Sequence, residues 1–448
     1  MSTRLRICCG VVALLSPGPL LAQALTLSPP DRQMTRDQVV AETMRPFAGK
    51  SMRGVGASTL NGKVVCGYQG WFNCEGDGAG LGWIHWGKDR KIRPGPGNIN
   101  IDLWPDTTEM APGELYATDF KFPDGGPGML FSSFNHATVV RHFRWMRDCG
   151  IDGAFVQRFM WAKMEPLQFR HRNVVLHNCR DGANLYGRTY AVMYDLSPMK
   201  AGQIEAVMDD WRALVDHMKI TSDGAYQRHG GKPVIAVWGF GFKDRQVTVE
   251  DGLTLLRFLK NDPKYGGLCV MLGVPAGWRR QERDCAKDTR WEELMGLADI
   301  ISPWTVGRYR DAKDAEKYVT DLAAADLRWC ADRGKDFMPV VFPGFSWHNL
   351  KGGADPKAVL DQIPRDGGRF LWSQYVAHKR AGAKMIYQAM FDEVDEGTAI
   401  FRCANVPPGT NFVTYGGLPP DFYMRLVGQG GRMLRGEAPV SDHMPALR

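Results

Sequence analysis

Short apolar runs alternate with segments of helical period along most of this chain, and this alternation constrains the fold more than any other feature. Each run suits a strand that is buried on both faces. Alternation of strands with helices predicts β/α units around a parallel sheet. The eight runs are Val64–Tyr68, Gly153–Arg158, Tyr190–Asp195, Pro233–Phe240, Cys269–Val274, Ile300–Trp304, Met338–Phe342 and Met385–Phe391.

A helical segment follows each run, although a long loop separates the first strand from its helix. The expected helices are Thr138–Cys149, Arg170–Asn178, Gly202–Met218, Val249–Leu259, Trp291–Leu297, Ala312–Ala331, Gly368–Ala381 and a last one from a cap at Asp421 to about Leu434. Eight strand–helix pairs predict an α/β fold, a single (β/α)8 TIM barrel with a long loop after strand 1. A doubly wound sheet more often has five or six strands.

The N-terminus has the pattern of a secretory signal peptide. Arg4 and Arg6 form a basic start, an apolar core covers Cys8–Leu15, and small residues end at Ala24. We expect cleavage after Ala24 and export to the periplasm or the extracellular space. The remaining divisions are an N-terminal arm at 25–62, the catalytic barrel at 63–437 and a C-terminal tail at 438–448.

Charge and composition narrow the classes of partner. The formal net charge is +7, with charges of both signs spread along the chain and no basic block of the kind that binds nucleic acid. No stretch provides the roughly 20 apolar residues that a membrane helix needs. We therefore expect no nucleic acid partner, no membrane insertion and a monomer.

Eight cysteines follow the signal segment, and an even number in an exported chain permits disulfides. Cys66 with Cys74 and Cys269 with Cys285 are plausible local bridges, but the pairing does not follow from the sequence. No spacing of cysteine and histidine suggests zinc, and the glycine-rich run at 76–82 matches no nucleotide fingerprint. We predict no cofactor and no metal.

The last apolar run ends in four acids, Asp392, Glu393, Asp395 and Glu396. In a barrel, the chemistry lies where strands end. Hydrolysis of a glycoside needs a proton donor and a second carboxylate, about 5 to 9.5 Å apart, so Glu393 and Glu396 are the predicted catalytic pair. The loop must curl to bring them together, which Gly397 permits. Crowding and burial should raise at least one pKa.

Other interpretations of these acids stay open. The segment suits a solvated loop, and Asp392 and Asp395 together with Glu396 could hold a cation. Spacing does not decide between retention and inversion.

Aromatic and polar residues follow the strand ends and are the predicted substrate-binding set. Aromatic rings pack on the apolar faces of sugars, although tryptophans in the long loop could equally form core. The set is Tyr68, Trp71, Trp86, Asp102, Trp104, Gln157, Arg158, Asp195, Trp238, Trp304, Arg308, Trp347 and His348.

The acidic segment 392–398 resembles the Asn-Glu-Trp-His-Glu-Gly-Thr motif of the endo-acting α-mannosidases and α-mannanases of glycoside hydrolase family 99. The chain is also similar to bacterial proteins grouped with families 71 and 99 under a xylosidase/arabinosidase label. This similarity covers roughly 64–401 and includes Gly67–Phe72, Asp102–Asp106, Arg141–Trp145, Tyr190–Asp195, Pro303–Gly307 and Phe342–Trp347.

The resemblance implies a barrel and a retaining mechanism through an anhydro-sugar intermediate. Glu393 would help to deprotonate the sugar 2-hydroxyl, and Glu396 would act as acid and base. Asp392, Val394 and Asp395 replace the Asn, Trp and His of the motif. Because the tryptophan is lost, the resemblance supports hydrolase chemistry better than α-mannoside specificity.

The leading hypothesis is an exported glycoside hydrolase that acts on a polysaccharide or glycan. A carbohydrate-binding barrel without turnover is the alternative. A metal-dependent lyase or hydrolase is a third, and it predicts loss of activity with a chelator.

Overall fold

The computed structural model describes residues 24–352 and 355–447, and its centre is a closed barrel of parallel strands. Strand β1 (Val64–Tyr68) pairs with β4 (Gly153–Phe159), followed in order by β5 (Thr189–Asp195), β7 (Lys232–Trp238), β8 (Cys269–Val274) and β9 (Ile300–Pro303). On its other side, β1 pairs with β12 (Ile386–Gln388). All of these pairings are parallel.

One extended segment closes the barrel. Its first part, β10 (Asp336–Phe337), pairs with β9, and its second part, β11 (Val340–Val341), pairs with β12. Together they make the remaining wall strand, so the predicted (β/α)8 barrel and all eight predicted strands are confirmed. The strand residues are almost all buried, as expected for a sheet covered on both faces.

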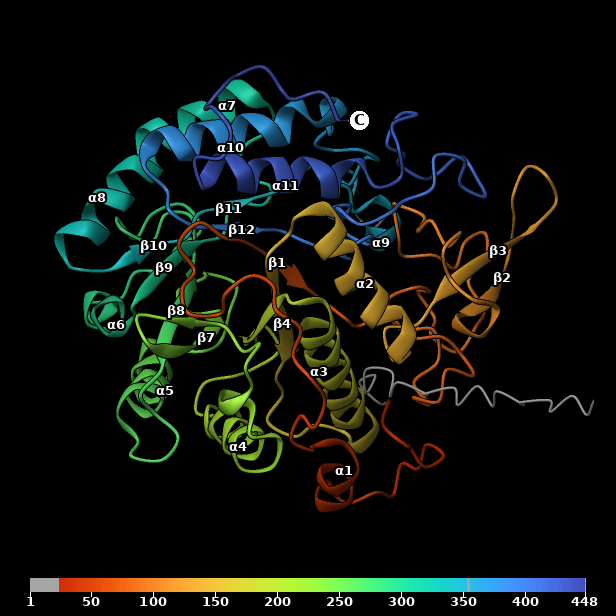
Figure 1. Cartoon of the computed structure of the whole chain (residues 1–448), viewed down its shortest axis with the longest axis horizontal. Helices are drawn as coiled ribbons and strands as arrows, with labels where there is room; N and C mark the ends of the chain where they lie inside the picture. Colours follow the sequence, from red (N-terminus) through yellow and green to blue (C-terminus); the bar gives the residue numbers. More distant parts are fainter. Residues whose placement is uncertain (1–23, 353–354, 448) are drawn as a thin grey trace, which may run out of the picture.

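Helices surround this barrel (Figure 1). They are α2 (His136–Cys149), α3 (Pro166–Tyr186), α4 (Glu205–Ala213), α5 (Val249–Asn261), α6 (Trp291–Leu297), α7 (Ala312–Tyr318) with α8 (Ala324–Asp332), α10 (Arg369–Ala381) and α11 (Phe422–Leu434). One wide turn, η2 (Leu214–Met218), extends α4, and another, η4 (Val319–Ala323), joins α7 to α8. Each helix matches a predicted one, and most ends differ by a few residues. The exception is α3, which begins four residues before and ends eight residues after the predicted range Arg170–Asn178.

Helix α11 completes the outer ring between α10 and α2. Two of its glycines permit the close contact, because a Cβ on Gly428 would lie 1.8 Å from the carbonyl oxygen of Cys149 and one on Gly430 would meet the ring of Tyr375. Asp421 occupies the predicted cap position, but its side chain accepts no capping hydrogen bond and instead accepts one from Arg425 Nε at 2.7 Å.

The long loop after strand 1 contains structure that we did not predict. An antiparallel hairpin of β2 (Leu115–Lys121) and β3 (Pro127–Phe131) extends from the barrel in Figure 1. The signal for it was available, because Asp124-Gly125-Gly126 between two stretches with β-forming residues is a turn sequence. The short turn η1 (Pro112–Glu114) precedes it.

The other short elements lie at the edges of the barrel. Helix α1 (Arg36–Thr43) belongs to the N-terminal arm, begins with a capping box at Thr35 and packs against α3. The remaining elements are η3 (Ile220–Ser222), β6 (Arg228–His229), α9 (His348–Lys351) and η5 (Asp366–Gly368). The predicted signal segment lies, up to residue 23, outside the described residues.

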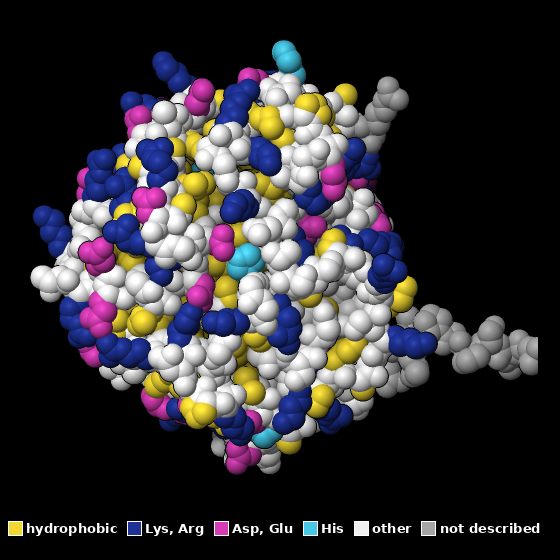
Figure 2. Space-filling view, turned by 60° about the vertical axis from the view of Figure 1, so that its left-hand side comes forward, with side chains coloured by type: hydrophobic (Ala, Val, Ile, Leu, Met, Phe, Trp, Pro, Cys, Tyr) yellow, Lys and Arg dark blue, Asp and Glu magenta, His cyan; other side chains and the backbone are white. Residues whose placement is uncertain are grey.

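The plausible disulfides are not formed. All eight cysteines from Cys66 to Cys403 are free, and seven of them are buried. Cys74 donates its thiol hydrogen to the carbonyl oxygen of Phe131, and Cys285 donates to that of Ala286. In the described part of the chain, no helix is long and apolar enough to cross a membrane. On the face in Figure 2, basic and acidic side chains are interspersed.

Candidate active site

The segment after β12 folds back over the mouth of the barrel and is fixed to the segment after β1. The carboxylate of Asp392 accepts hydrogen bonds from the backbone N–H groups of Gln69 and Gly70, at 2.8 and 2.9 Å. The backbone N–H groups of Thr398 and Ala399 both donate to the carbonyl oxygen of Glu393. The acidic segment is therefore a closed turn at the strand ends of the barrel, and the curl that we predicted is present.

Gly397 makes this turn possible. Its φ is +63°, and a Cβ at this position would lie 2.7 Å from the backbone nitrogen of Ser346. That nitrogen donates to the carbonyl oxygen of Glu396 at 2.9 Å. Only glycine meets both requirements without strain, so the curl that the spacing of the two glutamates demands is present.

Glu393 lies deep in the site, with a residue exposure of 4%. Thr398 Oγ1 donates to Glu393 Oε2 at 2.6 Å, and Gln69 Nε2 donates to Oε1. Burial raises the pKa of Glu393 well above its usual value, and the negative charges of Glu396 and Asp395 raise it further. The two donated hydrogen bonds act in the opposite direction because they stabilise the carboxylate.

Glu396 is half-buried, and its carboxylate forms no ion pair with a described residue. Burial raises the pKa of Glu396 to about 7, Asp395 raises it as well, and the positive charges of Lys351 and Arg245 lower it. Two carboxyls that interact this strongly share a proton near neutral pH. The pair can therefore supply one acid and one carboxylate, the combination that glycoside hydrolysis requires.

Asp195, at the end of β5, is close enough to Glu396 for its charge to contribute to raising the pKa of that carboxyl. Burial raises the pKa of Asp195 itself to about 6, against two hydrogen bonds donated by Ser197. Asp395 is held differently, by a hydrogen bond from His85 Nδ1 to its Oδ2 at 2.9 Å. Asp392 and Asp395 are thus both bound by protein groups.

A cavity of about 390 Å³ lies beside the acid pair, between the segments that follow β1, β4 and β5. Its wall includes Gln69, which contacts Glu393, and His85, which contacts Asp395. The rings of Trp71 and His85 stack with centroids 3.8 Å apart and planes at 5°. Of the predicted substrate-binding residues, Trp71 and Gln157 line this cavity.

Three further predicted residues, all tryptophans, lie at other strand ends. Trp238 and Trp304 pack edge to face with centroids 5.9 Å apart, and Trp304 also contacts Tyr387 inside the barrel. Trp347 lies under the ammonium group of Lys351, at 4.3 Å from its ring centre. Because Lys351 lowers the pKa of Glu396, Trp347 is near the acid pair.

Five predicted substrate-binding residues are core or framework instead. The side chains of Tyr68, Trp86 and Trp104 are fully buried among other rings. Arg158 is buried in an ion pair with Asp210 at 2.6 Å. Asp102 accepts hydrogen bonds from the backbone N–H groups that begin α9. These five side chains serve the packing and the hydrogen bonding of the barrel and its loops, and none of them lines the cavity.

Two more predicted residues lie away from the cavity. Arg308 pairs with Asp284 at 2.8 Å on an exposed edge. His348 bonds the carbonyl oxygen of Ala358 and lines a different hollow of about 420 Å³. Both follow strands of the barrel, but neither lines the cavity beside the acid pair.

Our sequence-based set omitted several residues that the fold brings to the site. Tyr387 accepts a hydrogen bond from Gln157 Nε2 at 3.0 Å. Arg245 and Lys351 add positive charge near Glu396. The inward position of Tyr387 follows from strand alternation and could have been found, whereas the two cations lie beyond strand ends, where periodicity gives no signal.

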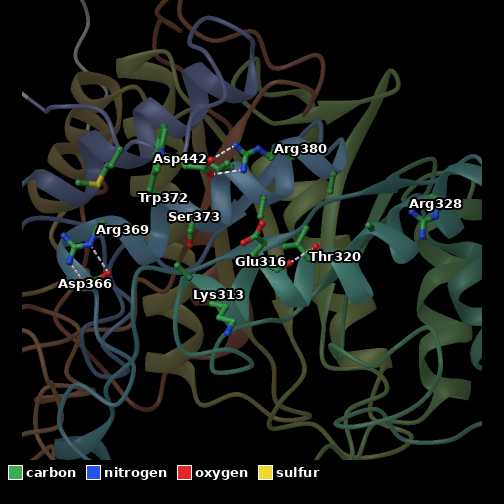
Figure 3. Close-up of a pocket in the computed structure, with 17 residues that line it drawn as sticks. Lys313, Glu316, Thr320, Arg328, Asp366, Arg369, Trp372, Ser373, Arg380 and Asp442 are labelled. Atoms are coloured by element: carbon green, nitrogen blue, oxygen red, sulfur yellow. Dashed lines mark hydrogen bonds and ion pairs between the residues drawn. The ribbon is translucent and has the colours of Figure 1, made fainter.

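A larger hollow, of about 730 Å³, lies outside the barrel between α7, α8 and α10 (Figure 3). Its charged side chains largely satisfy one another, as in the pairs Arg369–Asp366 and Arg380–Asp442. It is remote from the strand ends, and we do not assign the chemistry to it.

No protein-family model matches the sequence, and no curated protein matches it. Solved structures do share its fold. The endo-α-mannosidase of glycoside hydrolase family 99 from Bacteroides thetaiotaomicron aligns with a TM-score of 0.61 at 16% identity, over 84% of this chain and 99% of that one. A glycoside hydrolase-like protein aligns with a TM-score of 0.51 at 12% identity, over 87% and 98%.

These likenesses confirm the predicted fold, in agreement with the closed ring of strands. They also agree with the resemblance of the acidic segment to family 99, which was recognised from its residues. The chain has the (β/α)8 barrel fold of the family 99 endo-α-mannosidase.

Proposed function

We propose that this protein is an exported glycoside hydrolase that cleaves a polysaccharide or glycan with Glu393 and Glu396. The observation that carries this proposal is the environment of the pair. Both carboxyls lie at the carboxyl end of β12, have raised pKa values and form no ion pair with a described residue. A raised pKa without a neutralising partner is typical of a catalytic acid.

The surroundings of the two glutamates suggest different roles. Glu396 is the more exposed and can reach a leaving-group oxygen, so it is the proposed acid and base. Glu393 is buried and receives hydrogen bonds from Gln69 and Thr398, which hold its carboxylate in place. By the resemblance to family 99, it would help to deprotonate the sugar 2-hydroxyl, with retention.

The solved neighbour is an endo-α-mannosidase, but we do not extend its substrate to this chain. At the position of the motif tryptophan, Val394 is fully buried, and its carbonyl oxygen accepts hydrogen bonds from Asp102 and Leu103. It presents no ring to a sugar. The pair Glu393 and Glu396 therefore supports glycoside hydrolysis as the reaction, and it does not identify the sugar of the substrate.

The deciding experiment is a screen of purified protein on defined glycans, with the anomer of the first product read by NMR. Release of product with retained configuration would support the proposed chemistry. Binding without product, from every glycan that binds, would reject hydrolysis in favour of the carbohydrate-binding alternative. Loss of product formation in the presence of a chelator would favour the metal-dependent alternative.

Export is a separate part of the proposal and rests on the first 24 residues. Sequencing the N-terminus of protein recovered outside the cytoplasm should give a chain that begins at Leu25. Recovery in the cytoplasm with an intact N-terminus would contradict export without affecting the proposed chemistry.

A further inference from the structure

The cavity beside the acid pair contains a positive charge that the protein does not neutralise. Arg172, on α3, lines the cavity and is half-buried. Its guanidinium donates a hydrogen bond to the carbonyl oxygen of Gln168 at 3.2 Å and lies over the ring of Trp161, 4.6 Å from the ring centre. Among the described residues, no carboxylate lies within ion-pair distance of it.

Nearby charges compensate this arginine only in part. The charge of Asp210 raises the pKa of Arg172, but Asp210 forms its ion pair with Arg158 and accepts two hydrogen bonds from it and one from the hydroxyl of Tyr194. Burial and the like charge of Arg158 lower the pKa of Arg172 to about 9, so it remains a cation at neutral pH. A partly buried cation without a counter-ion is costly, which makes it a strong anion site.

The rest of the cavity wall carries no opposing acid. None of its described lining residues is an aspartate or a glutamate. Burial lowers the pKa of His171 to about 3, so this ring is neutral; its Nε2 donates to the carbonyl oxygen of Gly70. Glu393 and Asp395 do not line the cavity themselves; they bind the lining residues Gln69 and His85. Arg172 lies on a different part of the wall, which α3 provides.

Polar atoms with no protein partner point to a ligand that carries hydroxyls. Gln69 Oε1, Asn73 Oδ1 and Gln157 Oε1 are buried acceptors without a hydrogen bond from a described residue, and Trp71 Nε1 is a buried donor in the same condition. All four residues line the cavity. Buried polar groups are normally paired. A sugar hydroxyl can donate a hydrogen bond to the three acceptors and accept one from the Trp71 donor. The aromatic residues Trp71 and Trp161 also line the cavity, as is common where a protein binds the C–H groups of a sugar.

We propose that this cavity binds an acidic sugar residue, with its carboxylate or sulfate group on Arg172 and its hydroxyls on the glutamine and asparagine side chains. This inference rests on the proposed hydrolase function and narrows its substrate to anionic glycans. A planar guanidinium suits a carboxylate in particular, because the two can form paired hydrogen bonds.

Binding of free monosaccharides tests the inference without requiring hydrolysis, since these probes contain no glycosidic bond. Isothermal titration calorimetry would compare glucuronate, galacturonate and mannuronate with glucose, galactose and mannose, and glucose 6-sulfate with glucose. We expect at least one acidic sugar to bind about 10- to 100-fold more tightly than its neutral parent, the range for a hydrogen-bonded charge pair. Raising the salt concentration should weaken this preference.

Three variants locate the effect. Arg172→Gln should abolish the preference for the acidic sugar and leave binding of the neutral parent nearly unchanged, whereas Arg172→Lys should retain part of the preference. Arg328→Gln removes an exposed arginine from the outer hollow of Figure 3 and should behave as the wild type. Thermal unfolding would confirm that all three variants fold. If one does not fold, the comparison of acidic with neutral sugars on the wild-type protein still tests the inference.

Each outcome has one meaning. A preference for uronates or for the sulfated sugar that depends on Arg172 supports the inference and identifies the anion. Equal affinity for acidic and neutral sugars, or a preference that survives in Arg172→Gln, overturns it. If acetate or sulfate binds as tightly as the acidic sugars, the cavity recognises only the anion, and the proposal that it binds a sugar is overturned. Hydrolysis of neutral glycans alone would overturn the inference and leave the hydrolase proposal standing, whereas no hydrolysis would count against the hydrolase.

Discussion

Thr398 donates its hydroxyl hydrogen to Glu393 Oε2 at 2.6 Å, across the turn that follows β12. Both side chains are buried, and Gln69 from the segment after β1 binds the other carboxylate oxygen. The catalytic face thus holds Glu393 from two strand ends that adjoin in the barrel. Such a fixed carboxylate is what a reaction with a defined geometry needs.

Replacing Thr398 by valine should test this contact with little change in volume. Without the donated hydrogen bond, the pKa of Glu393 should rise, so the acidic limb of the pH–activity curve should move to higher pH. We expect kcat/KM to fall roughly 10-fold or more, the value of a hydrogen bond to a charged group. Thr320→Val on the outer face is the matched control. An unshifted pH profile would show that the hydroxyl does not tune Glu393.

The variants Glu393→Gln and Glu396→Gln should each lose most of their turnover. Removing an acid or base group from the reaction costs about 10²- to 10⁴-fold, while the cavity and its sugar contacts remain. Turnover on a cleaved glycan and calorimetric binding would be measured in parallel, with exposed Glu316→Gln as the control. Full turnover in both variants would reject the assignment of the catalytic pair.

The pH dependence of kcat/KM should be bell-shaped with an alkaline limb near pH 7. The pKa of Glu396 is raised to about 7, so its carboxyl is protonated below that pH and loses its proton above it. A general acid works only in the protonated form, hence activity should fall as pH rises through this value. The apparent pKa values belong to the coupled pair. Activity that keeps rising above pH 8 would exclude Glu396 as the acid.

Arg158 should matter for stability and not for substrate binding. Its ion pair with Asp210 is buried, with side-chain exposures of 2% and 1%. Arg158→Met leaves Asp210 without its partner and should lower the free energy of unfolding by about 3–5 kcal/mol. The double variant Arg158→Met/Asp210→Leu should recover much of this loss. A stable single variant with a raised KM would return Arg158 to the substrate-binding set.

All eight cysteines from Cys66 to Cys403 should react as free thiols. In denaturant without reductant, iodoacetamide should label every one, as peptide mass spectrometry can show. The native protein should react slowly, since burial raises thiol pKa values, that of Cys269 to about 12 for example. A linked peptide pair containing Cys66 and Cys74 would contradict the structure.

The architecture of the barrel could be predicted because it depends on short-range pattern. Each wall strand is buried on both faces and therefore appears as an apolar run, and the run Cys269–Val274 matches β8 at both ends. The least regular strand is the segment split into β10 and β11, where the predicted range began two residues late. The hairpin β2–β3 was missed because it lies outside the repeating β/α pattern.

The position of the acid pair could also be predicted, since the end of a barrel strand is on the catalytic face whatever the details of packing. The roles of the surrounding residues could not. Asp102 and Arg158 have the residue types of a binding site. However, Asp102 accepts hydrogen bonds from the first N–H groups of α9, and Arg158 neutralises Asp210. Sequence position places a residue near a strand end and leaves the direction of its side chain open.

The sequence by itself therefore determined the barrel, the end of the barrel at which the acids gather and the turn that carries Glu393 and Glu396. The tertiary structure decided which charges are neutralised. Arg158 and Arg172 lie 14 residues apart and have the same chemistry, yet one is paired with Asp210 and the other faces the cavity without a carboxylate. That difference arises from contacts between distant segments, because electrostatic energies depend on distances in space and on burial.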